Sequence, residues 1–394
     1  MTLANAHALF VGLKADPSYL ANLTIEEHER AALMSARQRI RGALKAASLS
    51  LSLTDAYWDD SYVRKFAART RQRIEVKFMT QGSFAYGTLN EPAQKPYQEI
   101  DLDDGMYVPV DFLENGEPAL AAKGLFLFVE TALLPLCDEM GWKLDDKYHE
   151  NCVRIKLWPG AHIDIPIYSI PRDRYEAITE TLEKAFATHM ARDSMTPNWK
   201  LPSDQIMLAQ RSGTWIQSDP QQLHDWVKGR IERYGPIFRR LSRFFKGWRD
   251  HTWVKPELSS LCVMCGVDQA LRDLDGFPTE NRDDELIMEV AKRLPAIFSG
   301  KVSNPVLQHL CLNSWTEGTR DNIVRATKEL SDHMTAALER TGDAEEVVKK
   351  LRGRFGNRVP YRPDAVKIAN KIEAIQRAAP ATVSSPKIIP STSG

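Results

Sequence analysis

The chain has 394 residues, and 52 lysines and arginines balance 52 aspartates and glutamates. This length allows two or three domains or one bilobed unit, and the balanced charge argues against a protein that coats nucleic acid over its whole surface. The five cysteines lack the spacing of a disulfide framework or a zinc ribbon, which favours the reducing cytoplasm. We expect no membrane span and no secretory signal, since no apolar run is long enough and the first residues are not basic.

The first predicted element is a long amphipathic helix. Thr24 followed by Glu27 is the pattern of a capping box, in which each side chain bonds the other residue's backbone N–H. Apolar residues then recur every three or four positions, at Leu33, Ala36, Ile40, Leu44, Ala47 and Leu51. This spacing predicts a helix of about 25 residues within an N-terminal segment, 1–54.

A Gly-Ser turn follows at Gly82 and Ser83. Residues 74–78 (IEVKF) alternate between apolar and polar and predict a strand that ends at this turn. Glycine lets the backbone approach a ligand closely, and N–H groups that open the next helix can hold phosphate oxygens. The turn is therefore a candidate phosphate-binding element.

The next predicted strand, 99–108, carries alternating aspartates. Asp101 and Asp103 share one face, and Ile100 and Leu102 share the other. Two close carboxylates repel each other, and a divalent cation such as Mg²⁺ relieves the repulsion and accepts oxygen ligands. Glu99 lies on the same face, so the spacing alone leaves it open as a further ligand.

A third acid is predicted on a later strand, 162–168. Isoleucines alternate there with His162, Asp164 and Pro166, which leaves Asp164 as a lone acid on the polar face. Arg154 lies on the preceding strand, and two interpretations stay open for it: contact with a triphosphate, or an ion pair with an acid.

The second half of the chain is predicted to be helical. Apolar residues at helical spacing indicate one helix over 226–248, on which Lys246 and Arg249 lie one turn apart and could point together at phosphates. Ser259 and Ser260 indicate a helix N-terminus suited to an anion. Ser218 is equally a nucleotide contact or the cap of a helix that starts at Pro220.

Six strings carry a resemblance to a known family: QGSFAYGTLN, QEIDLDDGMYVPV, HIDIPIYSIP, TWIQSDP, FKGWRD and RFGNRV, in that order. Together they resemble the bacterial cGAS/DncV-like nucleotidyltransferases (CD-NTases), and within them the cyclic GMP–AMP synthases. The resemblance runs from about residue 25 to the last residue. It implies an α+β fold: a polymerase-β-type core, with a mixed twisted sheet flanked by helices and a long N-terminal helix, and a C-terminal helical lobe.

The resemblance also implies a division of the chain and roles for residues. The expected parts are the core at 55–190, a crossover at 191–218, the helical lobe at 219–379 and a disordered tail at 380–394. Asp101, Asp103 and Asp164 are expected to be catalytic and to hold two Mg²⁺ ions, with Mn²⁺ as an alternative, while Glu99 supports them and Asp104 is structural. The expected nucleotide-binding residues are Gln81, Gly82, Ser83, Tyr86, Arg154, Ser218, Lys246 and Ser260.

The implied activity is synthesis of 3′,3′-cyclic GMP–AMP from ATP and GTP, as a second messenger that activates an effector in antiphage defence. The family also implies a ubiquitin-transferase-like partner that conjugates the protein through Gly394, and no obligatory nucleic-acid activator. Two alternatives stay open: a nucleotidyltransferase with another cyclic or linear product, and a catalytically silent nucleotide-binding scaffold.

Overall fold

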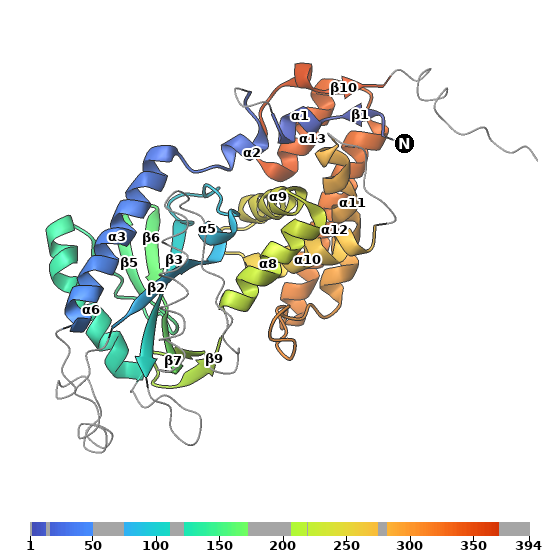
Figure 1. Cartoon of the computed structure of the whole chain (residues 1–394). Coiled ribbons are helices and arrows are strands. Elements are labelled where there is room, and N and C mark those ends of the chain that lie inside the picture. The colour runs from blue at the N-terminus through green and yellow to red at the C-terminus, as the bar shows by residue number, and fades with distance from the viewer. Residues whose placement is uncertain are drawn as a thin grey trace, which may run out of the picture.

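The computed structural model of the chain describes residues 2–12, 16–49, 75–110, 122–171, 206–218, 220–274 and 282–369. These residues form two lobes, a sheet lobe with helices against the sheet and a helical lobe beside it (Figure 1).

Helix α3 (Glu27–Leu49) is the predicted long helix, with 23 residues. Its apolar stripe is buried in the core of the sheet lobe, at Leu33, Ala36, Ile40 and Leu44. The predicted capping box is wrong, because the helix begins only at Glu27. The Thr24 hydroxyl instead donates to the Leu20 carbonyl and accepts from Arg243 of the helical lobe.

Within the described ranges, the sheet has eight strands in the order β4-β5-β6-β3-β7-β8-β9, with β2 paired to β3. The strands are β2 (Lys77–Gln81), β3 (Ile100–Val110), β4 (Lys143–Leu144), β5 (Val153–Trp158), β6 (Ala161–Ile165), β7 (Ile167–Pro171), β8 (Met207–Ala209) and β9 (Trp215–Gln217). Strand β3 is parallel to β6 and β7 and antiparallel to β2, so the sheet is mixed, as predicted.

Strand β3 separates the core from the functional face. Ile100 and Leu102 are fully buried in the core shared with α3 and α6 (Ala122–Met140). Asp101 and Asp103 lie on the opposite face and line a cavity that the helical lobe also lines. The predicted alternation of this strand is confirmed.

The helical lobe is arranged around α9 (Ile237–Thr252), whose buried face includes Phe238, Phe244 and Trp248. The other helices of this lobe are α8 (Pro220–Tyr234), α10 (Ser260–Arg272), α11 (Asp283–Ser299), α12 (Glu317–Thr335), η2 (Ala336–Arg340), α13 (Ala344–Phe355) and η3 (Pro363–Ala365). The prediction of one helix over 226–248 is wrong. Gly235 has a φ of 73° and Pro236 follows it, so the backbone leaves the helical conformation between α8 and α9.

The first described residues also belong to the helical lobe. Strand β1 (Ala4–Asn5) pairs with β10 (Lys367–Ile368), and α1 (His7–Phe10) and α2 (Tyr19–Asn22) pack into the helical core (Figure 1). The rings of Phe10 and Tyr19 lie 5.4 and 5.3 Å from that of Phe355. The chain therefore starts in the helical lobe, enters the sheet lobe at α3 and returns at α8.

A segment after α5 (Gly82–Tyr86) joins the two lobes, and we call residues 86–98 the lobe strap. The Asn90 amide donates to the Arg243 carbonyl at 2.8 Å, and the Gln98 amide donates to the Asp250 carbonyl at 2.9 Å. These bonds hold the strap along α9, so the sequence that follows the Gly-Ser turn positions one lobe on the other.

Some predicted parts lie outside the described residues. The expected crossover, 191–218, is described only from residue 206, where β8 and β9 extend the sheet. The expected tail, 380–394, lies wholly outside the described residues. The domain boundaries stay predictions. Among the described helices, none is both long and apolar enough to cross a membrane.

Candidate active site

The Gly-Ser turn lies directly against the aspartates. Strand β2 runs to Gln81, three residues beyond the predicted strand, and Gln81 pairs with Asp103 of β3. Gly82 has a φ of 66°, and a Cβ at this position would lie 1.9 Å from the Asp103 Oδ2 atom. Only glycine leaves room for this close approach, which gives the turn its fixed place beside the acid.

The parallel pairing of β3 with β6 brings the three predicted acids together. Asp101 is the register partner of His162, and Asp103 is the partner of Asp164. Burial raises the pKa of Asp103 well above its usual value, and the charges of Asp101 and Asp164 raise it further. The acids thus form a site where a cation would be favoured.

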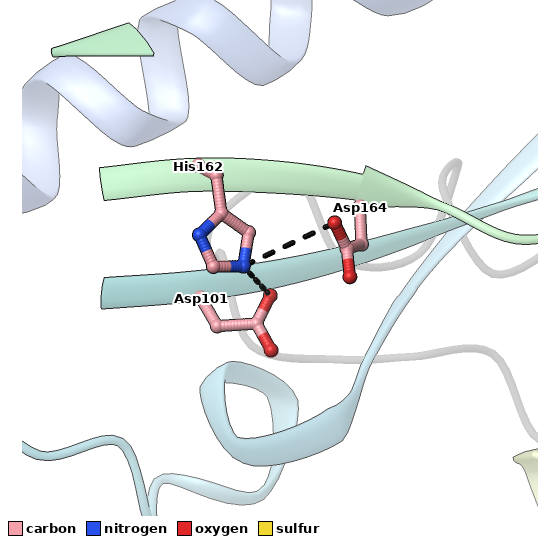
Figure 2. A group of neighbouring side chains, drawn as sticks. All are labelled: Asp101, His162 and Asp164. Atoms are coloured by element: carbon pink, nitrogen blue, oxygen red, sulfur yellow. Dashed lines mark ion pairs between the residues drawn. The ribbon is translucent and has the colours of Figure 1, made fainter. Parts of the chain in front are cut away.

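Asp101, His162 and Asp164 converge from the two neighbouring strands (Figure 2). One potential ligand atom from each lies within 4.8 Å of the other two. Asp101 Oδ1 and His162 Nε2 are buried and lie 3.1 Å apart, an ion pair when the imidazole is protonated. Buried acceptors of this kind fit a divalent metal ion.

Glu99 and Asp104, the two acids next to this group in the sequence, each contact a different basic side chain. Glu99 Oε2 lies 2.6 Å from His162 Nδ1, so Glu99 contacts the imidazole through the ring nitrogen that does not face Asp101. Burial lowers the pKa of His162, but the contact with Asp101 and the negative charges around it outweigh burial and raise it. Asp104 is structural, as predicted, because it is 1% exposed and accepts two hydrogen bonds from Arg41.

Arg154 pairs with the third acid itself. Its Nε and Nη2 atoms donate to the two oxygens of Asp164, each at 2.7 Å. Of the two interpretations left open by the sequence, the structure favours the ion pair, since Arg154 does not line the cavity described next. Its expected contact with nucleotide stays a prediction.

A cavity of about 380 Å³ lies between the lobes, within the size range of ligand-binding pockets. Most of the expected site residues line it: Gln81, Gly82, Ser83, Tyr86, Asp101, Asp103, Ser218, Lys246 and Ser260. Asp164 is 7% exposed and lies behind them.

Lys246 is the basic group of the cavity. It is 4% exposed, and its ammonium donates to the Thr88 carbonyl at 2.8 Å. Burial, and next the charge of Arg249, lower its pKa to about 7. Lys246 forms no ion pair in the described part of the chain. Arg249 does not join it, because Arg249 bonds Asp250 and the Ser260 hydroxyl instead.

The remaining expected contacts divide between packing and the cavity. Tyr86 belongs to the helical core and also lines the cavity, with its ring 5.8 Å from that of His224. Ser259, not Ser260, caps α10 by accepting from Cys262 N, which leaves Ser260 at the cavity wall.

Sequence reasoning missed several residues that line the cavity. Thr88 is 1% exposed, and its hydroxyl makes no hydrogen bond with any described residue. Tyr168 accepts a hydrogen bond from Gln81 at 2.9 Å. Asn304 comes from the loop after α11. Tyr168 follows the Asp164 strand closely and could have been suspected, whereas nothing in the sequence singles out Asn304.

Comparison with known proteins places the chain. The family profile described as "Cyclic GMP-AMP synthase DncV-like, nucleotidyltransferase domain" matches residues 76–168, and "Cyclic GMP-AMP synthase, C-terminal domain" matches residues 235–367. The cyclic GMP-AMP synthase of Vibrio cholerae serotype O1 is 33% identical over 338 residues, which cover 81% of this chain and 75% of that protein. The chain belongs to the DncV-like nucleotidyltransferase family.

Solved structures agree with this placement. The V. cholerae di-nucleotide cyclase DncV, as a mutant in complex with ATP, GTP and 5MTHFGLU2, matches with a TM-score of 0.77 and 28% identity over 94% of this chain and 100% of that one. DncV in complex with the linear intermediate 5′ pppA(3′,5′)pG matches with a TM-score of 0.75 and 26% identity, with the same coverage. This DncV-like protein is therefore a nucleotidyltransferase with the polymerase-β-type fold, which confirms the resemblance and the fold class.

Proposed function

We propose that the protein is a cyclic dinucleotide synthase that joins two nucleoside triphosphates and releases pyrophosphate. The observation that carries the proposal is one cavity lined by the Gly-Ser turn, by Asp101 and Asp103, and by the buried Lys246. Relatives with the same fold support it, because they have been crystallised with ATP, with GTP and with a linear dinucleotide intermediate.

Asp101, Asp103 and Asp164 would hold two Mg²⁺ ions, with Mn²⁺ as an alternative. Such ions neutralise a triphosphate and lower the pKa of an attacking 3′-hydroxyl. Lys246 contributes a positive charge to the cavity. Its ammonium donates to the Thr88 carbonyl, and phosphate oxygens of the substrate would replace this carbonyl as the hydrogen-bond acceptor. The other proposed nucleotide contacts are Gln81, Gly82, Ser83, Tyr86, Arg154, Ser218 and Ser260.

The product we propose is 3′,3′-cyclic GMP–AMP, formed from ATP and GTP in two rounds of the same transfer. By analogy with the family, it acts as a second messenger in the cytoplasm and activates an effector in antiphage defence, without an obligatory nucleic-acid activator. The balanced charge of the chain supports the last point, because a broad basic surface for RNA or DNA is not expected from it.

The test is incubation of the purified protein with the four labelled NTPs and Mg²⁺, followed by chromatography and nuclease digestion of the products. A nuclease-resistant product that requires both ATP and GTP is expected. A linear product, or another base composition, would favour a different nucleotidyltransferase. No product under any nucleotide and metal condition would favour the silent nucleotide-binding scaffold.

We further propose that Gly394 is a conjugation point for a ubiquitin-transferase-like partner. The family resemblance supports this proposal, and a glycine has no side chain to obstruct attack on a terminal carboxylate. Deletion of Gly394 should leave purified activity unchanged and remove any higher-mass adduct formed with such a partner. An adduct that persists and maps to a lysine by mass spectrometry would contradict this role.

A further inference from the structure

His162 lies inside the acid group, and the sequence pattern assigned it no role. It is 5% exposed, and it sits on β6 two residues before Asp164 and opposite Asp101 of β3. The parallel register therefore points all three side chains to the same face of the sheet. Figure 2 shows one ring nitrogen of the imidazole directed at both carboxylates, with dashed lines that mark the ion pairs.

Glu99 determines which ring nitrogen is available. Its Oε2 atom lies 2.6 Å from His162 Nδ1, a distance at which Nδ1–H donates to the carboxylate. The lone pair of a neutral imidazole is then on Nε2, which faces the acid group. A histidine that binds a metal through one nitrogen commonly donates its other N–H to a carboxylate in this way.

The atoms that face one another lie within the distances of shared ligands. His162 Nε2 lies 3.1 Å from Asp101 Oδ1 and 3.9 Å from Asp164 Oδ1. His162 Nε2 and Asp101 Oδ1 are both buried and pair with each other when the imidazole is protonated, so a bound cation would take the place of that proton. Separations of this size match ligands that share one cation at about 2.1 Å from each.

The charges around the group favour a neutral ligand over another acid. Both oxygens of Asp164 already accept from Arg154, and Asp103 adds a further carboxyl beside them. An imidazole completes the set without adding to the repulsion among these carboxylates.

We propose that His162 is a nitrogen ligand of a divalent metal ion shared with Asp101 and Asp164, and that Glu99 orients its ring for this. The inference rests on the proposed metal-dependent function, because it concerns the same acids. A mixed nitrogen and oxygen set raises affinity for transition-metal ions relative to Mg²⁺, since imidazole suits them and Mg²⁺ prefers oxygen. The site therefore favours first-row transition-metal ions over Mg²⁺, and Mn²⁺ is the paramagnetic member of that series used as the probe.

The test uses the full-length, nucleotide-free protein with MnCl₂ and pulsed EPR, which detects coupling between the metal electron spin and a directly bound nitrogen. We expect nitrogen coupling in the wild type and its loss in His162→Gln. Titration should show that His162→Gln weakens Mn²⁺ binding by about tenfold or more, and Mg²⁺ binding by less. His149→Gln is the matched control, since His149 also pairs with a carboxylate, Asp145 at 3.0 Å, outside the acid group.

A wild-type protein without nitrogen coupling, including one that binds no Mn²⁺, would overturn the assignment. Coupling that survives in His162→Gln would overturn it as well. The wild-type spectrum does not depend on whether a variant folds, and circular dichroism verifies the fold of each variant. The proposed function is judged separately, by the products formed from NTPs, so a synthase that binds its metal through oxygen alone would contradict only this inference.

Discussion

Replacing Lys246 with methionine should stabilise the nucleotide-free protein and impair nucleotide binding at once. Lys246 is buried, and its one hydrogen bond among the described residues is to the Thr88 carbonyl. Methionine has a similar length and no charge, so Lys246→Met removes a buried cation without leaving a large void. In the function proposed above, this charge binds the substrate's phosphates.

The size of the effect follows from the pKa. Burial lowers the pKa of Lys246 from 10.5 to about 7, and 1.36 kcal/mol per pH unit makes this about 5 kcal/mol. Below pH 7 both the folded and the unfolded chain hold the proton, so the folded protein is destabilised by the full free energy of burying the charged ammonium. Between pH 7 and 10.5 only the unfolded chain keeps the proton, so the free energy of unfolding rises with pH. The lost hydrogen bond offsets about 1 kcal/mol.

Urea unfolding at pH 6, 7.5 and 9 measures the difference. We expect Lys246→Met to be more stable than the wild type by about 4 kcal/mol at pH 6, with an advantage that shrinks as the pH rises. The control is Lys228→Met, because Lys228 is 61% exposed and should give little change at any pH. The reasoning is refuted if Lys246→Met is the less stable protein at pH 6, or if its offset does not depend on pH.

Three further changes test the site and its support. Asp103→Asn should lower product formation by about a thousandfold or more, because it removes a proposed metal ligand. Circular dichroism should show an intact fold, and the melting temperature should be no lower than that of the wild type, because the change relieves repulsion among the acids. Gly82→Ala should lower kcat by more than about tenfold, since its Cβ would collide with Asp103; an unchanged kcat would contradict this packing. Arg41→Met should cost about 3 kcal/mol or more in urea unfolding, because it leaves the buried Asp104 carboxylate without its counterion, whereas the exposed Lys45→Met should be neutral.

Local periodicity predicted the elements that build the site. The alternation in β3 placed Asp101 and Asp103 opposite the core, and the helical spacing of α3 identified its buried stripe, because burial repeats with the geometry of each element. The prediction of one helix over 226–248 missed the break at Gly235 and Pro236, although that dipeptide is a strong helix breaker and could have been read from the sequence.

Contacts between distant segments were not predictable in the same way. His162 meets Asp101 only through the register of two strands that are some sixty residues apart in the chain. Thr24 has the sequence pattern of a cap, but Arg243 of α9, more than two hundred residues later in the chain, binds its hydroxyl. In each case a tertiary partner decides the role of the side chain, and a single sequence does not name that partner.

The pairing of β1 with β10 sets the order in which the chain can fold during translation. All described strands of the eight-stranded sheet have been synthesised by residue 217, before α8 begins. Phe10 and Tyr19, by contrast, pack against Phe355, and Ala4 pairs with Ile368. The apolar side chains of the first two helices therefore lack part of their final contacts on the ribosome until Phe355 and Ile368 have emerged. Exposed apolar surfaces of this kind are where nascent chains bind chaperones or aggregate.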